Sequence, residues 1–175
     1  MSNPNPAHPR RKRRWLSLAA ELLVFAALFL GVRAYTGRSV VRGLAPALEG
    51  LTPQGQALSL AQMRGKPVLV HFWASWCGVC KLEQGSIESI ARGGKAQVLT
   101  VASGSGGAAK VASYMKSQGL TFPTIVDEDG DLAATFGVKS FPTTLVVGPD
   151  GTVRFSEVGY TTRLGMLARL WWAGR

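Results

Sequence analysis

Both cysteines of this 175-residue chain lie in one five-residue stretch, Trp76–Cys80, between two segments of opposite character. The preceding Val68–Trp73 is an apolar run of β-branched and aromatic residues bounded by Pro67, which is typical of a buried strand. The residues from Cys77 to about Ile90 lack proline and carry apolar side chains near helical spacing. The cysteine pair is therefore predicted to lie where a strand ends and a helix begins.

That position has chemical consequences for the two thiols. Backbone N–H groups at a helix start lack partners, and with the helix dipole they favour a thiolate over a thiol. A zinc site would need four ligands, and the only other soft candidates are His8 and His71. A purely structural disulfide would close too small a loop to contribute much stability. The pattern therefore favours redox chemistry, with Cys77 as the exposed nucleophile and Cys80 as the resolving thiol.

The apolar segment Trp15–Val32 predicts a membrane anchor over residues 15–34. A hydrocarbon core of about 30 Å needs about 20 helical residues, and Glu21 is the only charged residue in the run. Five basic residues at positions 10–14 predict a cytoplasmic N-terminus and an exported C-terminal domain. A cleaved signal peptide ending near Ala34 and a twin-arginine signal stay open as alternatives, and both also export the domain.

The formal net charge of +10 is concentrated in the N-terminal region. From Gly43 onward the chain has twelve basic and nine acidic residues, with no basic stripe interleaved with aromatic residues. This distribution gives no support to nucleic-acid binding and attributes the charge to the membrane.

The chain is predicted to consist of a basic cytoplasmic tail (1–14), the anchor (15–34), a tether (35–44) and one domain (45–175), whose length suits a single core. Alternating strand and helix signals in the domain predict a mixed sheet flanked by helices. Beyond the elements already named, we expect a hairpin over Gly50–Leu60, strands over Gln97–Ala102, Thr124–Val126, Thr143–Val147 and Thr152–Ser156, and helical segments over Ala108–Ser117, Leu132–Phe136 and Leu164–Trp172.

Two further segments are assigned structural roles. Ser103–Gly107 lacks the lysine of a phosphate-binding loop and is predicted to be a flexible surface loop. Trp171 and Trp172 are predicted to pack in the core, with one ring facing inward and the other against a neighbouring element.

The stretch Phe72–Lys81 resembles a thioredoxin active site. Over about residues 45–175, the chain is similar to bacterial membrane-anchored, extracytoplasmic thioredoxin-like proteins of the TlpA/ResA/DsbE group, and within it to ScsD-like protein disulfide oxidoreductases. Leu58–Pro67, Gly137–Thr144 and Asp150–Gly151 carry the rest of the similarity. The resemblance implies an α/β thioredoxin fold and a single-pass protein of the bacterial inner membrane with a periplasmic domain. It implies no cofactor beyond the redox-active disulfide.

The resemblance also implies a site for client proteins at Trp76, Phe141 and Pro142, with Pro142 preceded by a cis peptide bond. The residues alone leave this open, because Phe122–Thr124 repeats the same Phe-Pro-Thr tripeptide. The alternative for Pro142 is a trans proline at the start of a strand.

Two ionisable residues are candidates for proton transfer. Glu83 follows Cys80 by one helical turn, where relatives carry a glutamate that helps move the thiol proton, and the alternative is a solvated carboxylate. His71 occupies the strand position of the buried aspartate of thioredoxin. It could act as a base for Cys80 because histidine titrates near neutral pH, or it could be a hydrogen-bonded core residue.

Two functions are compatible with this pattern. The first is an extracytoplasmic enzyme that exchanges the Cys77–Cys80 pair with client proteins, as a reductant fed by a membrane thiol reductant or electron donor. An oxidising role is a variant of this function, because Val79 replaces the proline of thioredoxin. The second is a copper-binding or protein-interaction module with a non-catalytic disulfide.

Overall fold

The computed structural model describes residues 9–94 and 96–175 of the chain, which divides into two compact units, residues 1–36 and 37–175. The described part of the first unit is one helix, α1 (Pro9–Thr36). The segment Trp15–Ser39 is long and apolar enough to cross a membrane, and it covers the residues where the sequence predicts the anchor.

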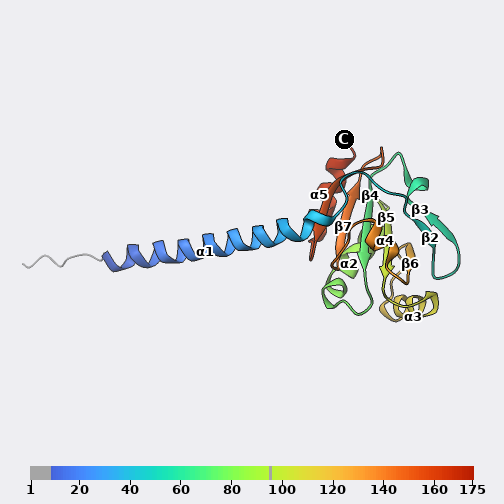
Figure 1. The fold of residues 1–175 in the computed structure, drawn as a ribbon, viewed down its shortest axis with the longest axis horizontal. Helices are drawn as coiled ribbons and strands as arrows, with labels where there is room; N and C mark the ends of the chain where they lie inside the picture. The colour runs from blue at the N-terminus through green and yellow to red at the C-terminus, as the bar shows by residue number, and fades with distance from the viewer. Residues whose placement is uncertain (1–8, 95) are drawn as a thin grey trace, which may run out of the picture. The chain divides into compact units, whose positions relative to one another are not determined.

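A central mixed sheet organises the second unit. Its strands are β1 (Gly43–Leu44), β4 (Val68–Trp73), β5 (Gln97–Ser103), β6 (Thr124–Asp127), β7 (Thr143–Val147) and β8 (Thr152–Val158). They lie in the order β1-β8-β7-β4-β5-β6 (Figure 1). The pairs β4–β5 and β5–β6 are parallel, whereas β4–β7, β7–β8 and β1–β8 are antiparallel. A separate two-stranded sheet joins β2 (Glu49–Leu51) and β3 (Ala57–Ser59) as the predicted hairpin.

Helices cover both faces of the central sheet and divide the core in two. One core cluster joins the sheet to α2 (Gly78–Arg92), α3 (Ala108–Gln118) and α5 (Arg163–Ala173). The other joins it to α4 (Asp131–Thr135) and to the short helix η2 (Leu60–Met63). Strand β4 feeds both clusters, because successive side chains point to opposite faces: Leu69 and Trp73 to the first, Val70 and Phe72 to the second. The α/β thioredoxin fold predicted from the sequence is confirmed.

The folded unit begins earlier than the boundary predicted at residue 45. Val40 is buried in the second core cluster, and the Val41 N–H donates to the Phe136 carbonyl oxygen at 3.1 Å. A Cβ on Gly137 would lie 1.8 Å from the Ser39 carbonyl oxygen, so only glycine allows this approach. Gly43 and Leu44 then pair with β8 as an edge strand. From the 3-10 helix η1 (Gly37–Ser39) onward, the segment predicted as a tether belongs to the domain.

Helix α5 is also packed differently from the prediction. Trp171 and Trp172 are 58% and 67% exposed, so the expectation that they pack in the core is wrong. The buried stripe of α5 consists of Met166, Leu170 and Ala173, spaced by four and three residues. Both tryptophans lie off that stripe and face outward.

Candidate active site

The two cysteines form a disulfide at the start of α2. Cys77 is the N-cap of the helix, and Cys80 lies one turn further along. The Cys80 backbone N–H donates to Cys77 Sγ at 3.1 Å. This N–H is one of those that a helix start leaves without an intrahelical partner. The strand-to-helix junction predicted from the sequence is therefore present, with the sulfur of Cys77 at the positive end of the helix dipole.

The two cysteines differ little in accessibility. Cys77 is 6% exposed and Cys80 is fully buried, and both belong to the core cluster that includes Trp73 and Ala74. The expectation of an exposed Cys77 is wrong for the disulfide form, because its side chain packs within this cluster. Cys77 remains the more accessible member of the pair, which suits attack on it by an external thiolate.

Aromatic side chains connect the cysteine loop to the loop before β7. The Trp76 and Phe141 rings meet edge to face, with centroids 5.9 Å apart. The Phe141–Pro142 peptide bond is cis, and it is the one cis bond among the described residues, so the bond before Pro123 is not cis. The Pro142 carbonyl oxygen accepts a hydrogen bond from the Gly159 N–H at 2.8 Å. Trp76 is 67% exposed, which leaves its ring available to a bound protein.

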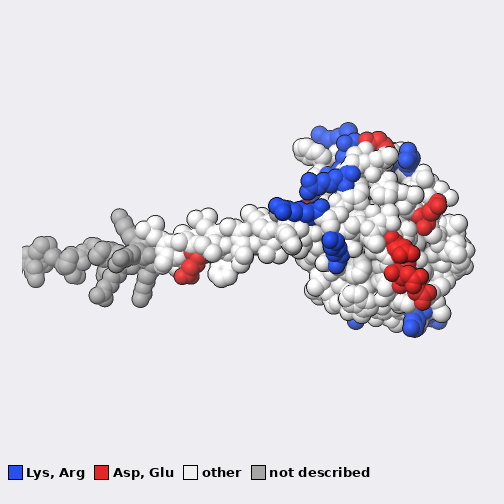
Figure 2. Space-filling model, viewed as in Figure 1, with Lys and Arg blue, Asp and Glu red and all other residues white. Residues whose placement is uncertain are grey.

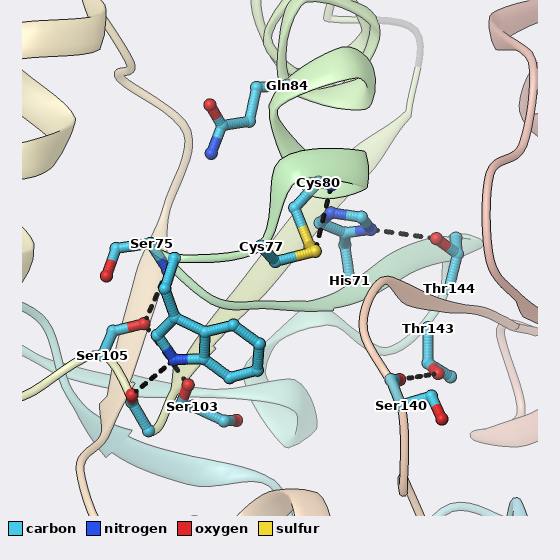
Figure 3. The surroundings of a disulfide bond; sticks show 12 residues. His71, Ser75, Cys77, Cys80, Gln84, Ser103, Ser105, Ser140, Thr143 and Thr144 are labelled. Carbon is cyan, nitrogen blue, oxygen red and sulfur yellow. Dashed lines mark hydrogen bonds between the residues drawn. A yellow bond between two sulfur atoms is a disulfide. The ribbon is translucent and has the colours of Figure 1, made fainter.

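The segment Ser103–Gly107 is hydrogen-bonded to the loop that carries Cys77 (Figure 3). Ser105 Oγ accepts a hydrogen bond from the Ser75 N–H at 2.9 Å, and the Gly104 carbonyl oxygen accepts one from Trp76 Nε1 at 2.9 Å. Ser103 and Ser105 are buried, so the expectation of a surface loop is wrong for these residues. Sequence reasoning missed this role, and the serines between the glycines are the signal that could have indicated it.

His71 is fully buried on β4 (Figure 3). Its Nδ1 lies 2.9 Å from Thr144 Oγ1, and its Nε2 has no hydrogen-bond partner among the described residues. Desolvation by burial lowers the pKa of His71 to about 3. The imidazole is therefore neutral near pH 7, which contradicts the premise that it titrates there.

His71 belongs to a row of polar side chains that crosses the sheet beneath α2. It is aligned with Thr144 on one side and Thr100 on the other, and Thr100 is aligned with Thr124. Thr100 Oγ1 lies 2.8 Å from Thr124 Oγ1 and accepts a hydrogen bond from Trp73 Nε1 at 3.1 Å. The row occupies the face that carries Leu69 and Trp73, which is the face covered by α2.

Glu83 is fully buried on α2, so the solvated-carboxylate alternative is wrong. Its Oε1 accepts a hydrogen bond from the Thr161 N–H, and its Oε2 has no hydrogen-bond partner among the described residues. Desolvation raises the pKa of Glu83 to about 7, against the smaller lowering effect of the Thr161 hydrogen bond. Of the two proton-transfer candidates, Glu83 is therefore the one that changes charge near neutral pH.

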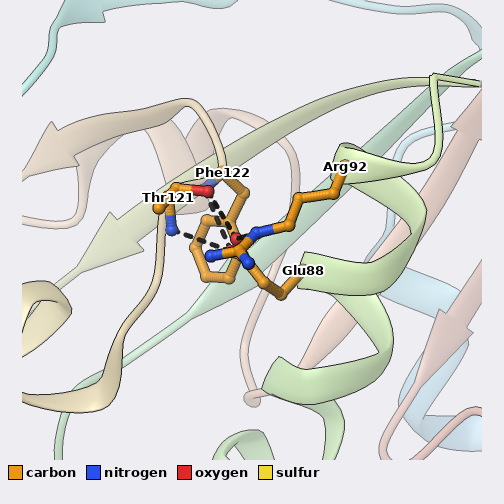
Figure 4. A network of polar contacts seen from close by, with 4 residues as sticks. All are labelled: Glu88, Arg92, Thr121 and Phe122. Carbon is orange, nitrogen blue, oxygen red and sulfur yellow. Dashed lines mark hydrogen bonds and ion pairs between the residues drawn. The ribbon is translucent and has the colours of Figure 1, made fainter.

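Glu88 is a second carboxylate on α2, and its pKa is shifted in the opposite direction from that of Glu83. Figure 4 shows its polar contacts. Glu88 accepts hydrogen bonds from the Thr121 N–H at 2.8 Å, the Phe122 N–H at 3.2 Å and Arg92 Nε at 2.6 Å, and also from the Thr121 hydroxyl. Burial by itself would raise the pKa of Glu88, but these hydrogen bonds lower it below its usual value. Glu88 thus holds the chain segment that leads into β6 against α2, which is a structural role.

Metal ligation is the other chemistry open to a pair of cysteines. In residues 9–94 and 96–175, no three His, Cys, Asp or Glu side chains come together in a way that could hold a metal ion. Among the described residues, the hydrogen bond to a cysteine sulfur comes from a backbone N–H, that of Cys80, which can position the sulfur of Cys77.

Comparison with known proteins gives a consistent result. Residues 41–156 match the AhpC/TSA family. The thiol-disulfide oxidoreductase ResA of Bacillus subtilis (strain 168) is 28% identical over 151 residues, which span 82% of this chain and 84% of that protein. A thioredoxin-like protein of Haemophilus influenzae is 34% identical over 121 residues, which span 69% of this chain and 71% of that protein.

Solved structures agree in fold. The exposed lipoprotein thioredoxin Etrx1 of Streptococcus pneumoniae strain TIGR4 superposes with a TM-score of 0.64 at 30% identity, covering 72% of this chain and 98% of that one. A thiol:disulfide interchange protein DsbE from Chlorobium tepidum superposes with a TM-score of 0.70 at 23% identity, covering 77% and 99%. The second likeness concerns the fold alone.

Proposed function

The chain belongs to the AhpC/TSA family and is a thiol–disulfide oxidoreductase, and we propose that its Cys77–Cys80 pair exchanges with client proteins outside the cytoplasm. The observation that carries the assignment of the site is the hydrogen bond from the Cys80 N–H to Cys77 Sγ at a helix start. In the dithiol form, the same N–H and the helix dipole stabilise a thiolate at position 77.

The reductive reaction balances as a two-electron exchange. The Cys77 thiolate attacks one sulfur of a client disulfide, forms a mixed disulfide, and releases the other client sulfur as a thiolate. Cys80 then loses its proton and attacks Cys77 Sγ, which releases the second client thiolate. The client has gained two electrons, and the Cys77–Cys80 disulfide is restored. A membrane thiol reductant returns the pair to the dithiol by the same steps in reverse.

Cys80 needs a proton acceptor, and we assign this role to Glu83. Its pKa of about 7 allows it to take a proton from a thiol and return it near neutral pH. His71, with a pKa of about 3, does not gain a proton under those conditions and instead orders the sheet beneath α2 through Thr144. We propose that clients bind against Trp76 and Phe141 and pair with the backbone beside cis-Pro142.

The N-terminal segment supports the location. The apolar part of α1, from Trp15 to Thr36, is long enough to cross a bilayer, and the basic block at residues 10–14 on its N-terminal side favours a cytoplasmic N-terminus. We propose a single-pass protein of a bacterial inner membrane whose residues 37–175 lie on the periplasmic side. There a disulfide persists unless a dedicated reductant opens it.

Two measurements test this function. Insulin reduction by the full chain should be abolished in Cys77→Ser, whereas equal rates for both would favour an interaction module with an idle disulfide. Titration of the Cys77–Cys80 pair against glutathione should give a potential below about −200 mV, nearer that of the reductant thioredoxin (about −270 mV) than that of the oxidant DsbA (about −120 mV). A potential well above that value would contradict the reductive direction and favour an oxidase.

The client class can be tested with a trapping variant. Cys80→Ala should stall the reaction at the mixed disulfide and accumulate Cys77-linked proteins, because the resolving thiol is gone. The matched control is the Cys77→Ser, Cys80→Ala double variant, which should capture nothing. Failure of Cys80→Ala to retain any disulfide-linked protein would contradict exchange with clients.

A further inference from the structure

The C-terminal end of α5 presents an aromatic and basic surface that the exchange reaction does not use. Trp171 and Trp172 are both exposed, and the Arg175 guanidinium lies 3.5 Å from the centroid of the Trp171 ring. Residues 163–175 contain three arginines and no acidic residue. Trp171 also borders a hollow in which Lys66 and Pro67 meet Leu167 and Leu170. We call Lys66, Trp171, Trp172 and Arg175 the α5 surface.

Charge is distributed unevenly over the folded unit. On its β6 side, one hollow is lined by five acidic residues, Glu49, Asp127, Glu128, Asp129 and Asp131. At the opposite edge of the sheet, β8 lies next to the edge strand β1. Both α5 and the first residues of the domain contact β8. Arg169 of α5 pairs with Glu157 of β8 at 2.7 Å, and β8 lies beside β1. Figure 2 shows Lys and Arg gathered on one side of the folded unit and most Asp and Glu on another.

The chain leaves almost no slack between the apolar segment and the folded unit. Helix α1 ends at Thr36 and Val40 is already buried in the domain core, so only residues 37–39 join the two. If the apolar part of α1 spans a bilayer, the folded unit begins within a few residues of that bilayer along the chain.

We propose that the α5 surface docks on the anionic headgroup surface of the bilayer that holds the N-terminal segment. Tryptophan is enriched at the membrane–water interface, at the level of the lipid headgroups, where the ring lies among apolar groups and the indole N–H stays hydrated. Arginine and lysine at the same depth are attracted to anionic lipids. The proposal rests on the membrane anchoring proposed above, and it adds which face of the domain meets the membrane.

Docking through this face leaves the disulfide accessible. A Cβ on Gly174 would lie 3.0 Å from Pro67 Cγ, so the end of α5 lies beside the first residue before β4. Cys77 follows the other end of β4, and a six-residue strand is about 20 Å long. The α5 surface and the cysteine loop therefore lie at opposite ends of the central strand, and clients can reach Cys77 while the domain is docked.

Fluorescence quenching by lipid tests this docking on the full chain. The chain has five tryptophans. Subtracting the emission of the double variant Trp171→Phe, Trp172→Phe from that of the wild type gives the emission of Trp171 and Trp172 alone. In vesicles of phosphatidylglycerol and phosphatidylcholine with acyl chains brominated near the headgroup, roughly half or more of this difference emission should be quenched. The matched control is Trp76→Phe, whose difference emission should stay unquenched because Trp76 lies at the other end of β4.

The outcomes separate docking from anchoring. Trp15 lies at the start of the apolar segment, so quenching that persists in the double variant reports insertion of that segment. If Trp15 is quenched and the α5 pair is not, docking is overturned while anchoring stands. If the α5 pair is shielded from aqueous iodide without being quenched by brominated lipid, a protein partner or a second copy covers it, and docking on lipid is overturned as well.

Discussion

Glu83 Oε1 accepts a hydrogen bond from the backbone N–H of Thr161, a residue 78 positions further along the chain. The contact joins α2 to the segment that leads into α5, and Glu83 is fully buried. Burial raises the pKa of Glu83 to about 7. Desolvation outweighs the lowering effect of the Thr161 hydrogen bond and places a titratable group near neutrality, one helical turn from Cys80.

Replacing Glu83 by glutamine should change both stability and activity in a pH-dependent way. The folded state keeps the Glu83 proton up to about pH 7, whereas the unfolded chain loses it near 4.5, so the contribution of Glu83 to stability falls as pH rises between these values. Glu83→Gln removes this loss and should be more stable than the wild type by about 3 kcal/mol at pH 8, with little difference at pH 4. Urea unfolding at both pH values measures this.

Insulin reduction by Glu83→Gln should also lose its inflection near pH 7, and an unchanged profile would contradict the proton-transfer role.

His71 should give a pH dependence of the opposite sign. Its folded pKa of about 3 lies below the unfolded value of 6.5, so its contribution to stability is present above pH 6.5 and is lost as pH falls. Because Glu83 acts in the opposite direction over the same range, the readout is the difference in unfolding free energy between the wild type and His71→Gln, which should shift against the wild type by about 2 kcal/mol between pH 7 and pH 5. The control is His8→Gln, the variant of the other histidine, which should keep the wild-type dependence. A pH dependence in His71→Gln equal to that of the wild type would show that the imidazole is solvated.

Ser105 should matter for exchange although it is remote from both sulfurs in sequence. Ser105→Ala removes the acceptor of the Ser75 N–H and loosens the loop that carries Trp76 and Cys77. Loss of one hydrogen bond of about 1 kcal/mol corresponds to roughly a fivefold lower kcat/KM for insulin reduction. Ser117→Ala, which removes an exposed hydroxyl bonded to the Tyr114 carbonyl, is the control and should leave the rate unchanged. Equal rates for both variants would exclude a bracing role for Ser105.

Glu88 should contribute to stability without affecting the exchange reaction. Glu88→Gln removes the charge that accepts hydrogen bonds from Thr121, Phe122 and Arg92, and should cost about 2 kcal/mol at pH 7. Because the folded pKa of Glu88 is lowered, this contribution is present above the unfolded value of 4.5 and is lost as pH falls through the folded pKa. Thermal unfolding at pH 7 and pH 3 measures both effects.

The control for Glu88 is Arg92→Gln, which removes only an ion pair whose arginine side chain is 63% exposed. Exposed pairs contribute little, so this variant should lose about 0.5 kcal/mol or less. A loss in Arg92→Gln as large as that in Glu88→Gln would assign the stabilisation to the ion pair and not to the Thr121–Phe122 segment.

Much of the fold could be predicted because its elements depend on residues close together in the chain. The strand Val68–Trp73 and the strand Thr143–Val147 have the predicted bounds, and α2, α3 and α5 begin within one residue of prediction. The apolar spacing of these segments, and the cap at Thr162 whose side chain accepts from the Gly165 N–H, are local signals.

Other features could not be predicted because they depend on residues far apart. The residues alone did not distinguish the two Phe-Pro bonds; the resemblance selected Pro142, and the bond before Pro142 is the cis one. The outward position of Trp171 follows from which stripe of α5 meets the sheet. The edge strand β1 exists because β8 offers a free edge to pair with Gly43.

The sequence by itself determined that a cysteine pair sits where a strand meets a helix, and that an apolar segment precedes the domain. Tertiary structure decided which carboxylate titrates near neutrality, which loop braces the cysteines and which face of α5 stays in solvent. The physical reason is that helix and strand formation depend on side chains a few positions apart. Desolvation and hydrogen bonding instead depend on partners such as Thr161, which the fold brings to Glu83 from a distant part of the chain.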